Sequence, residues 1–424
     1  MTNLKRQLFS VVAAGSLLVS VATPVLAADT NIQITGNGAG SNNYATVSQT
    51  NSNTVSQSNN ANVTNNVTSN ANTGNNSAGF NTGGDVTVKT GDATTKANVS
   101  NSLNSNAAQV AGCNCEGDTN VKVSGNGAYS DNLVTLKDTN VNSVGQTNNA
   151  NVTNNVDNNA KTGGNDANSN TGGDVVVVTG NAKAEANVKT VANSNSAVIG
   201  GGAGAGNSSA SFVISGNGAG SDNWIAATLT NANTIAQTNN ANVTNDVDSN
   251  AKTGYNDAGF NTGGDVVIAT GNAWSGAKVD NMVNFNSANL DYGCVTDVTA
   301  KIEGNGANPH SGWDWWWNQP ENGITLDLVN ANSVGQGNAA NLNNDVEADA
   351  KTGGNDAFSN TGSVTNNDDP AIITGDATNM TDVSNSGNVN TVGGAPFVIP
   401  MPGNTNMNVS FNIQALLAFF GLSM

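Results

Sequence analysis

The sequence predicts an all-β protein in which four repeats of about 90 residues form a β-solenoid, an array of stacked β layers. The first observation is a G-N-G-A motif that begins at Gly36, Gly125, Gly216 and Gly304, so that it recurs after 89, 91 and 88 residues. The second is that residues 28–308 contain no proline, which a continuous hydrogen-bonded ladder requires. The third is the alternation of small apolar and polar residues within every repeat, which is the period of a β-strand.

The composition restricts the kind of core that this chain can build. The 424 residues carry a formal net charge of −18, and Asn supplies about a fifth of them. A chain so rich in Asn, Gly, Thr and Ser is either disordered or folds by burying small apolar groups in thin layers. Val, Ala and Ile recur at a fixed phase in each repeat, which favours the ordered alternative. The acidic balance disfavours nucleic acid or an anionic membrane surface as a partner.

The first 27 residues have the features of a secretory signal peptide. Lys5 and Arg6 precede an apolar run over residues 8–21, and Val25 and Ala27 occupy the −3 and −1 positions of a cleavage site. We therefore expect a secreted, cell-surface protein whose mature chain has no transmembrane span. An uncleaved N-terminal anchor is the alternative, although the apolar run is short for a span.

Within a repeat, residues 54–72 alternate with period two. One parity contains Val55, Ala61, Val63, Val67 and Ala71. We expect the Asn-Asn pairs at 59–60, 65–66 and 75–76 to bend this segment. Further short strands are predicted at residues 86–88 and 97–99. The solenoid coil should then take about 18–25 residues, giving four or five coils per repeat, with Val and Ala inside and Asn ladders outside or at the corners. A string of small β-sandwich domains is disfavoured because the second repeat has few large core residues.

The domain boundaries follow from the repeats. The signal peptide occupies 1–27, and the repeats occupy 28–118, 119–209, 210–297 and 298–394. The fourth repeat contains a Trp-rich insertion at 309–322, and a Pro-containing apolar tail covers 395–424. The tail is too short for a membrane-spanning helix and is expected to cap the array or to associate with other copies.

Three charged positions recur in repeats two, three and four and are all neutral in repeat one, at Thr68, Asn72 and Ser77. Their joint loss predicts clusters of structural ion pairs around each K-T-G turn. The predicted clusters are Asp157, Lys161 and Asp166; Asp248, Lys252 and Asp257; and Glu347, Lys351 and Asp356. A catalytic carboxylate pair is disfavoured because a Lys lies between the acids and no nucleophile or His accompanies them.

Two other groups of residues suggest ligand or covalent chemistry. Asp85, Asp174 and Asp265 follow T-G-G turns and are weak candidates for structural calcium, although the β-roll calcium motif is absent. No other metal or cofactor is expected. In an exported protein Cys113 and Cys115 are the candidate disulfide pair, which leaves Cys294 without an assigned partner.

The insertion in the fourth repeat holds the only His, His310, and a concentration of Trp residues. The Trp residues are Trp313, Trp315, Trp316 and Trp317. Such rings stack on sugar faces or enter apolar surfaces. The competing interpretation is that they cap the open end of the solenoid.

Residues 31–393 resemble secreted bacterial Asn/Thr-rich surface repeat proteins of the adhesin-like β-solenoid kind. A weaker likeness to curlin repeats rests on Asn231, Gln237, Asn240, Ala241 and Val243, without the Gly that follows Gln in those repeats. The resemblance implies a structural or adhesive role as a non-catalytic scaffold or matrix component. The implied partners are cell-surface or matrix components, glycans, or further copies of the chain.

Three other functions are compatible with parts of the sequence. The main alternative is a carbohydrate-binding surface module that uses the Trp-rich insertion. Ice binding is disfavoured because the Thr residues do not form regular T-x-T rows. A polysaccharide-active β-helix enzyme is disfavoured because the chain has a single His. We therefore expect no enzymatic activity.

Overall fold

The computed structural model describes the backbone of residues 7–14, 17–22, 30–110, 118–200, 209–290, 297–306, 321–361, 371–393, 398–399 and 407–408. Side chains are described from residue 30 to residue 393 within these ranges, except at residue 297. The described residues form strands, turns and bends and contain no helix, which confirms the prediction of an all-β protein. It follows that no helix in these ranges is long and apolar enough to cross a membrane.

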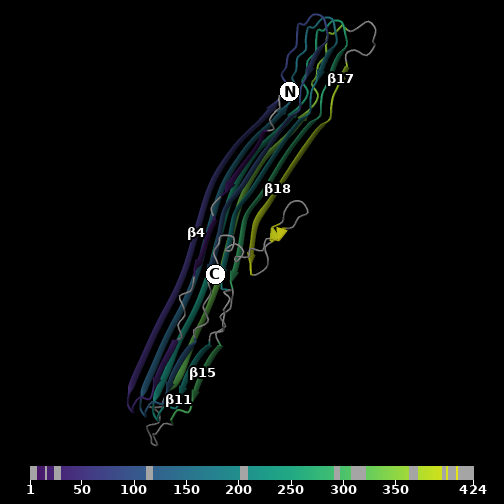
Figure 1. Ribbon diagram of the computed structural model, residues 1–424. Helices are drawn as coiled ribbons and strands as arrows, with labels where there is room; N and C mark the ends of the chain where they lie inside the picture. Colours follow the sequence, from purple (N-terminus) through teal and green to yellow (C-terminus); the bar gives the residue numbers. More distant parts are fainter. Residues whose placement is uncertain are drawn as a thin grey trace.

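Each repeat contributes one strand to each of four parallel sheets, which run along an elongated molecule (Figure 1). The first sheet contains β3 (Thr30–Thr35), β7 (Thr119–Ser124), β11 (Ser209–Ser215) and β15 (Asp297–Glu303). The second contains the long strands β4 (Asn42–Asn72), β8 (Asp131–Lys161), β12 (Asp222–Lys252) and β16 (Asn322–Lys351). The third contains β5 (Val86–Lys89), β9 (Val175–Val178), β13 (Val266–Ala269) and β17 (Ala371–Ile373). The fourth contains β6 (Ala93–Val110), β10 (Ala182–Ile199), β14 (Ala273–Leu290) and β18 (Ala377–Val392).

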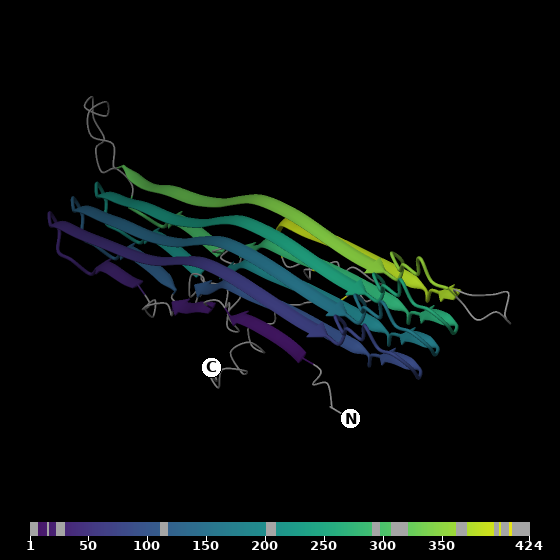
Figure 2. The ribbon, with the colours of Figure 1, turned by 90° about the horizontal axis from the view of Figure 1, so that it is seen from above.

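The strands of one repeat make up one layer of the molecule. We call β3–β6 layer 1, β7–β10 layer 2, β11–β14 layer 3 and β15–β18 layer 4. Figure 2 shows β4, β8, β12 and β16 lying side by side in sequence order. Equivalent residues of successive layers are paired, so that Val63 lies beside Val152 and Val152 beside Val243. The strands of one layer therefore take up a whole repeat, and the expected coil of 18–25 residues is wrong.

The bends expected at two of the Asn-Asn pairs are also wrong. β4 runs without a break through residues 59–60 and 65–66 over 31 residues. The side chains of Asn59 and Asn65 are hydrogen-bonded to the next layer, so they do not compete for their own backbone as they do in a turn. The pair at 75–76 does lie in a turn, where Asn75 adopts a positive φ of 61°.

The core lies between the long-strand sheet on one side and the sheets of β3 and β6 on the other. The predicted alternation is confirmed, since Val55, Val67 and Ala71 are buried while Ala61 and Val63 are partly buried in β4. The layer 2 equivalents of all five positions are buried, because that layer is covered on both sides. The predicted short strands at 86–88 and 97–99 are confirmed as β5 and the central part of β6.

β6 and its equivalents each contain a kink at one residue, which the local sequence pattern did not predict. At this position φ is positive in every layer, at Asn104, Asn193, Asn284 and Asn388. In β10, the pairing with β14 skips Asn193 and resumes at Ser194. The inward parity therefore changes, from Leu103 before the kink to Asn106 after it. Asn is suited to this position because it adopts left-handed conformations more readily than most residues.

The K-T-G motif, which is N-T-G in repeat one, marks a place where successive layers almost touch. A methyl group added to Gly74 would lie 1.9 Å from the carbonyl oxygen of Gly163. The same distance separates a methyl on Gly163 from the oxygen of Gly254. Only glycine fits between layers at this point, which explains why the motif recurs.

Two further strands lie within the predicted signal peptide. β1 (Gln7–Ala14) and β2 (Leu17–Ala22) pair in parallel with β6, at residues 95–102 and 105–110 respectively. They occupy the edge of β6 that faces away from β10. In the tail, β19 (Val398–Ile399) and β20 (Met407–Asn408) pair with each other in antiparallel orientation.

Candidate functional site

The most extensive polar feature of the molecule is an unbroken zigzag of amide side chains inside it. It starts at Asn59 of β4, whose Nδ2 donates to Asn106 Oδ1 of the facing β6 at 2.8 Å. Asn106 then donates to Asn148 of layer 2 at 2.9 Å. The same alternation continues through Asn195, Asn239, Asn286, Asn338 and Asn390, with distances of 2.8–2.9 Å. We call this series the amide zigzag.

The amide zigzag is buried in the middle of the molecule. Asn148 and Asn239 are fully buried, and Asn106 and Asn195 are almost so. A buried amide without partners costs about 1–3 kcal/mol, so the zigzag holds the facing sheets in one register. Slipping β8 by two residues along β4 would place Asn148 beside Gln57 or Ala61 in place of Asn59. The expectation that Asn ladders lie outside or at corners is therefore incomplete, because the largest ladder is internal.

A glutamine column runs beside the amide zigzag. Gln146 Nε2 donates to Gln57 Oε1 at 2.7 Å and to the backbone oxygen of Ser196 at 2.9 Å. Gln237 and Gln336 extend the column in the same direction. These Gln residues, one from each repeat, thus form a ladder across the four layers that also connects the two facing sheets.

The predicted ion-pair clusters around the K-T-G turns are not brought together as ion pairs. Within the described part of the chain, Lys161 Nζ donates to Asn75 Oδ1 at 2.7 Å, and Lys351 pairs with Asp349 at 2.6 Å. The hydrogen bond from Lys351 to Asp349 raises the pKa of Lys351. The in-register stacking places like charges beside each other instead, with Asp248 between Asp157 and Glu347. Burial, followed by the charges of Glu347 and Asp157, raises the pKa of the Asp248 carboxyl.

The interlayer ion pairs occur where opposite charges share one position in adjacent repeats. Lys96 is paired with Glu185 at 2.7 Å, and Lys278 with Asp382 at 2.9 Å. The hydrogen bond from Lys96, opposed by partial burial, lowers the pKa of the Glu185 carboxyl. Aligning the repeats and searching each column for opposite charges would have found both pairs.

Two of the three candidate calcium ligands act as hydrogen-bond acceptors between layers. Asp85 Oδ1 accepts from the backbone nitrogen of Asp174 at 3.1 Å, and Asp174 Oδ1 accepts from that of Asp265 at 2.9 Å. No group of three or more His, Cys, Asp or Glu side chains suited to a metal occurs among the described residues. The carboxylates of Asp85 and Asp174 thus have a structural role in stacking the turns, whereas Asp265 Oδ1 is buried without a hydrogen-bond partner among the described residues.

Several predicted site residues lie outside the described residues. They are His310, Trp313, Trp315, Trp316 and Trp317 of the insertion and the cysteines Cys113, Cys115 and Cys294. The glycan-binding, capping and disulfide hypotheses for them stay predictions.

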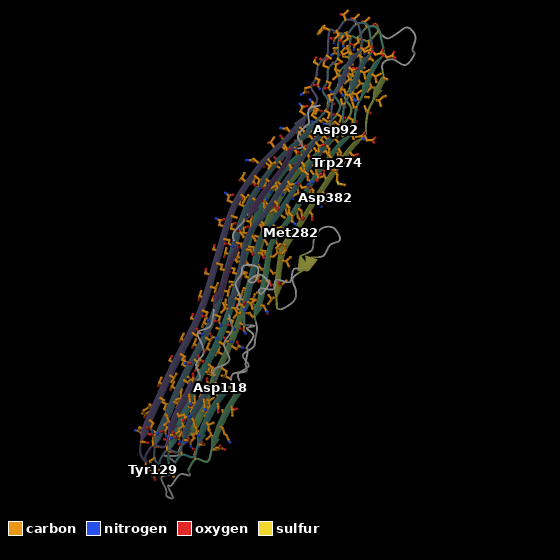
Figure 3. The ribbon with its side chains drawn as sticks, viewed as in Figure 1. Asp92, Asp118, Tyr129, Trp274, Met282 and Asp382 are labelled. Carbon is orange, nitrogen blue, oxygen red and sulfur yellow. The ribbon has the colours of Figure 1, made fainter. Side chains whose placement is uncertain are left out.

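Exposed aromatic rings mark the turns between the long strands and the short ones. The side chains of Phe80 and Phe260 are 86% and 58% exposed. Both residues also adopt positive φ values. Phe260 meets the ring of Phe358 edge-on at 4.8 Å. Figure 3 places another exposed ring, Tyr129, near one end of the molecule. Trp274, which is partly exposed, lies in β14 far from that end. No repeated sequence pattern indicates these rings, because they are single residues in different repeats.

The four stacked layers present columns of polar side chains on their surface and edge strands at the two outer layers. No family model, no curated protein and no solved structure matches the chain.

Proposed function

We propose that this chain is a β-solenoid structural protein of the cell exterior that acts as a non-catalytic scaffold, adhesive or matrix component. The observation that carries the proposal is the continuous in-register stacking of the four layers. Such an array is stiff along its strands and repeats the same surface, which suits a mechanical or display role.

The outward faces support this proposal because they are covered by exposed amide columns. Asn149 and Asn151 of β8 donate to Asn60 and Asn62 of β4 at 3.2 and 3.1 Å. These columns give a hydrated surface that stays soluble while offering many weak contacts. A surface of this kind fits an extracellular protein that meets glycans or matrix components.

The extracellular location rests on the N-terminal sequence. The basic residues, the apolar run and the small residue at Ala27 are the features that a secretory signal peptide requires. Removal of residues 1–27 after export would also remove β1 and β2 from the edge of β6.

A carbohydrate-binding role is the second candidate, favoured by the four Trp residues within residues 309–322. Deletion of residues 309–322 separates this role from capping. If the insertion binds glycan, the deletion variant keeps the melting temperature of the parent and loses glycan-array binding. If it caps the array, the melting temperature falls by several degrees and the parent shows no glycan binding.

The structural role is tested on cells that express the intact gene. Antibody labelling of unpermeabilised cells should detect the protein at the surface or in the matrix, and mild protease treatment of the cells should remove it. Deletion of the gene should reduce attachment of the cells or the cohesion of their matrix. Detection of the protein in the cytosolic fraction alone would contradict the proposal.

A further inference from the structure

The core of the molecule is open at layer 4. Ile302, Ile372 and Val383 are 46%, 45% and 42% exposed. Their partners in layer 3, Ile214, Ile268 and Val279, are each 0% exposed. Apolar side chains of successive layers are stacked in columns through the interior. The columns that contain these three residues end at layer 4 in an exposed side chain whose equivalent in layer 3 is buried.

The hydrogen bonds of the internal Asn columns have a direction. In the column formed by the Asn residues at the kink, Asn104 Nδ2 of layer 1 donates to Asn193 Oδ1 of layer 2. Asn193 donates in the same way to Asn284, and Asn284 to Asn388 of layer 4. Asn104, Asn193 and Asn284 each also donate to a backbone oxygen of the next layer. For Asn104 this acceptor is the backbone oxygen of Asn149. Asn388, in layer 4, lies at the end of this column, where the next acceptors would belong to a further layer.

Layer 1 offers the complementary group. Asn104 Oδ1 is buried and accepts no hydrogen bond, whereas the equivalent oxygens of layers 2, 3 and 4 each accept one from the layer below. If a further layer lay beneath layer 1 in the register used between the molecule's own layers, the side-chain amide of its residue equivalent to Asn388 would point at Asn104 Oδ1. The two ends of the molecule are thus complementary to each other.

The distribution of charge across this junction favours the same arrangement. Stacking layer 1 on layer 4 would place Thr68 beside Glu347 and Asn72 beside Lys351, following the register of β4 to β16. The joint neutrality of Thr68, Asn72 and Ser77 therefore avoids extending the columns of like charge. Among the residues whose side chains are described, one acid pair, Asp376 and Asp92, would be brought together at an exposed turn, so that salt should favour the contact.

The edge of β6 accepts an added parallel strand. β1 and β2 pair with it in register, from Gln7 opposite Thr95 to Ala22 opposite Val110. The edges of β3, β4 and β5 in layer 1 carry no paired strand among the described residues. Loss of residues 1–27 would leave all four edges of layer 1 open, and open edges are templates for further pairing.

We propose that layer 4 of one molecule binds layer 1 of a second copy in the register used between its own layers. The contact joins two different surfaces and repeats the parallel in-register step between the molecule's own layers, so it does not close into a ring and generates a linear fibre. The proposal rests on the proposed structural function and specifies its partner as the chain itself. While β1 and β2 remain on β6, they occupy the strand position that β18 of the second copy would take.

Two glycines allow this contact to be blocked without disturbing the single molecule. Nothing lies within 4 Å of a methyl group added to Gly353, whereas the equivalent methyls on Gly74, Gly163 and Gly254 each meet the layer above at 1.9 Å. A second copy on layer 4 would place its Gly74 in that position. Gly353 does not have a positive φ, so alanine is tolerated there. The same is true of Gly335, which provides the control described below.

Gly91 has the same property on the opposite surface. A methyl group on Gly180 or Gly271 would lie about 2.5 Å from the layer below, while nothing lies within 4 Å of one on Gly91. In the proposed contact Gly375 of the other copy would lie there. Gly91→Ala therefore blocks layer 1, and Gly353→Ala blocks layer 4. Gly335→Ala is the matched control, because its column already accommodates Ala236 and nothing lies within 4 Å of the added methyl.

The experiment uses the exported protein, with its N-terminus read by mass spectrometry, in sedimentation assays and electron microscopy. We expect fibres with a layer spacing of about 4.8 Å and a molecular repeat of four layers, about 19 Å. Gly353→Ala and Gly91→Ala should each melt as the parent does and raise the concentration needed for assembly on the order of 10- to 100-fold. Gly335→Ala should assemble as the parent does, and the unprocessed chain should assemble more slowly than the processed one.

Mixing the two blocking variants tests the direction of the contact. Each variant keeps one intact surface, and the two intact surfaces are complementary, so an equal mixture should form dimers and no fibres. Monomers at all concentrations, closed dimers of the parent, or fibres that ignore both substitutions would overturn the proposal. If the protein is found at the cell surface and mediates attachment but stays monomeric, this inference fails while the proposed function stands.

Discussion

Asn148 of β8 donates its Nδ2 hydrogen to Asn195 Oδ1 of the facing β10 at 2.8 Å, and both side chains are buried. Asn148 also accepts from Asn106 and donates to Asn239, so one residue links both sheets and three layers. This amide occupies the kind of position that Val or Leu fills in most β proteins.

The first prediction concerns inward and outward amides of the same strand. Asn148→Ala removes a buried amide and leaves its partners without bonds, so the free energy of unfolding should fall by about 1–3 kcal/mol. Asn151→Ala, on the exposed face of β8, should change it by less than about 0.5 kcal/mol. Denaturant unfolding of both variants measures the difference, and equal effects would show that the buried zigzag has no special contribution.

The second prediction concerns charge coupling between layers. Lys96→Met and Glu185→Gln should be non-additive by about 0.5 kcal/mol, since the pair is partly exposed. Because the pKa of Glu185 is lowered in the folded state, this coupling should be present above about pH 4.3 and be lost as the pH falls through the folded pKa. A double-mutant cycle at two pH values measures it.

The matched control for that cycle is the pair of Lys252 and Asp257, which forms no ion pair in the described structure. Lys252→Ala and Asp257→Ala should be additive within about 0.3 kcal/mol. Strong coupling at this pair, together with none at Lys96 and Glu185, would contradict the interlayer pairing.

The third prediction concerns the column of like charges. The folded-state pKa of Asp248 is raised, so its ionised form disfavours folding at neutral pH, and this penalty disappears as the pH falls below the unfolded pKa of about 3.9. Asp248→Asn should therefore stabilise the protein by a few tenths of a kcal/mol at pH 7. The gain should vanish near pH 3. A gain that is independent of pH would exclude relief of charge repulsion as its cause.

The sequence predicted the strands and the buried parity of β4 because both depend on local alternation. The apolar positions Val55, Val67 and Ala71 were assigned to the interior correctly. The Asn positions between them could not be assigned in the same way. An Asn that forms a turn and one that forms a ladder have the same local sequence, and the difference is whether a partner layer lies within hydrogen-bonding distance.

By itself, the sequence determined the all-β class, the period of two, the number of repeats and the absence of proline from the array, since each follows from residue type and spacing. Only the tertiary structure decided that one layer takes a whole repeat of about 90 residues. It also decided that Asn59 lies inside, and that Asp248 stacks between like charges instead of pairing with Lys252. The physical reason is that parallel in-register pairing places identical positions side by side. The partner of each side chain is therefore its own equivalent in the next repeat, a relationship that no local pattern encodes.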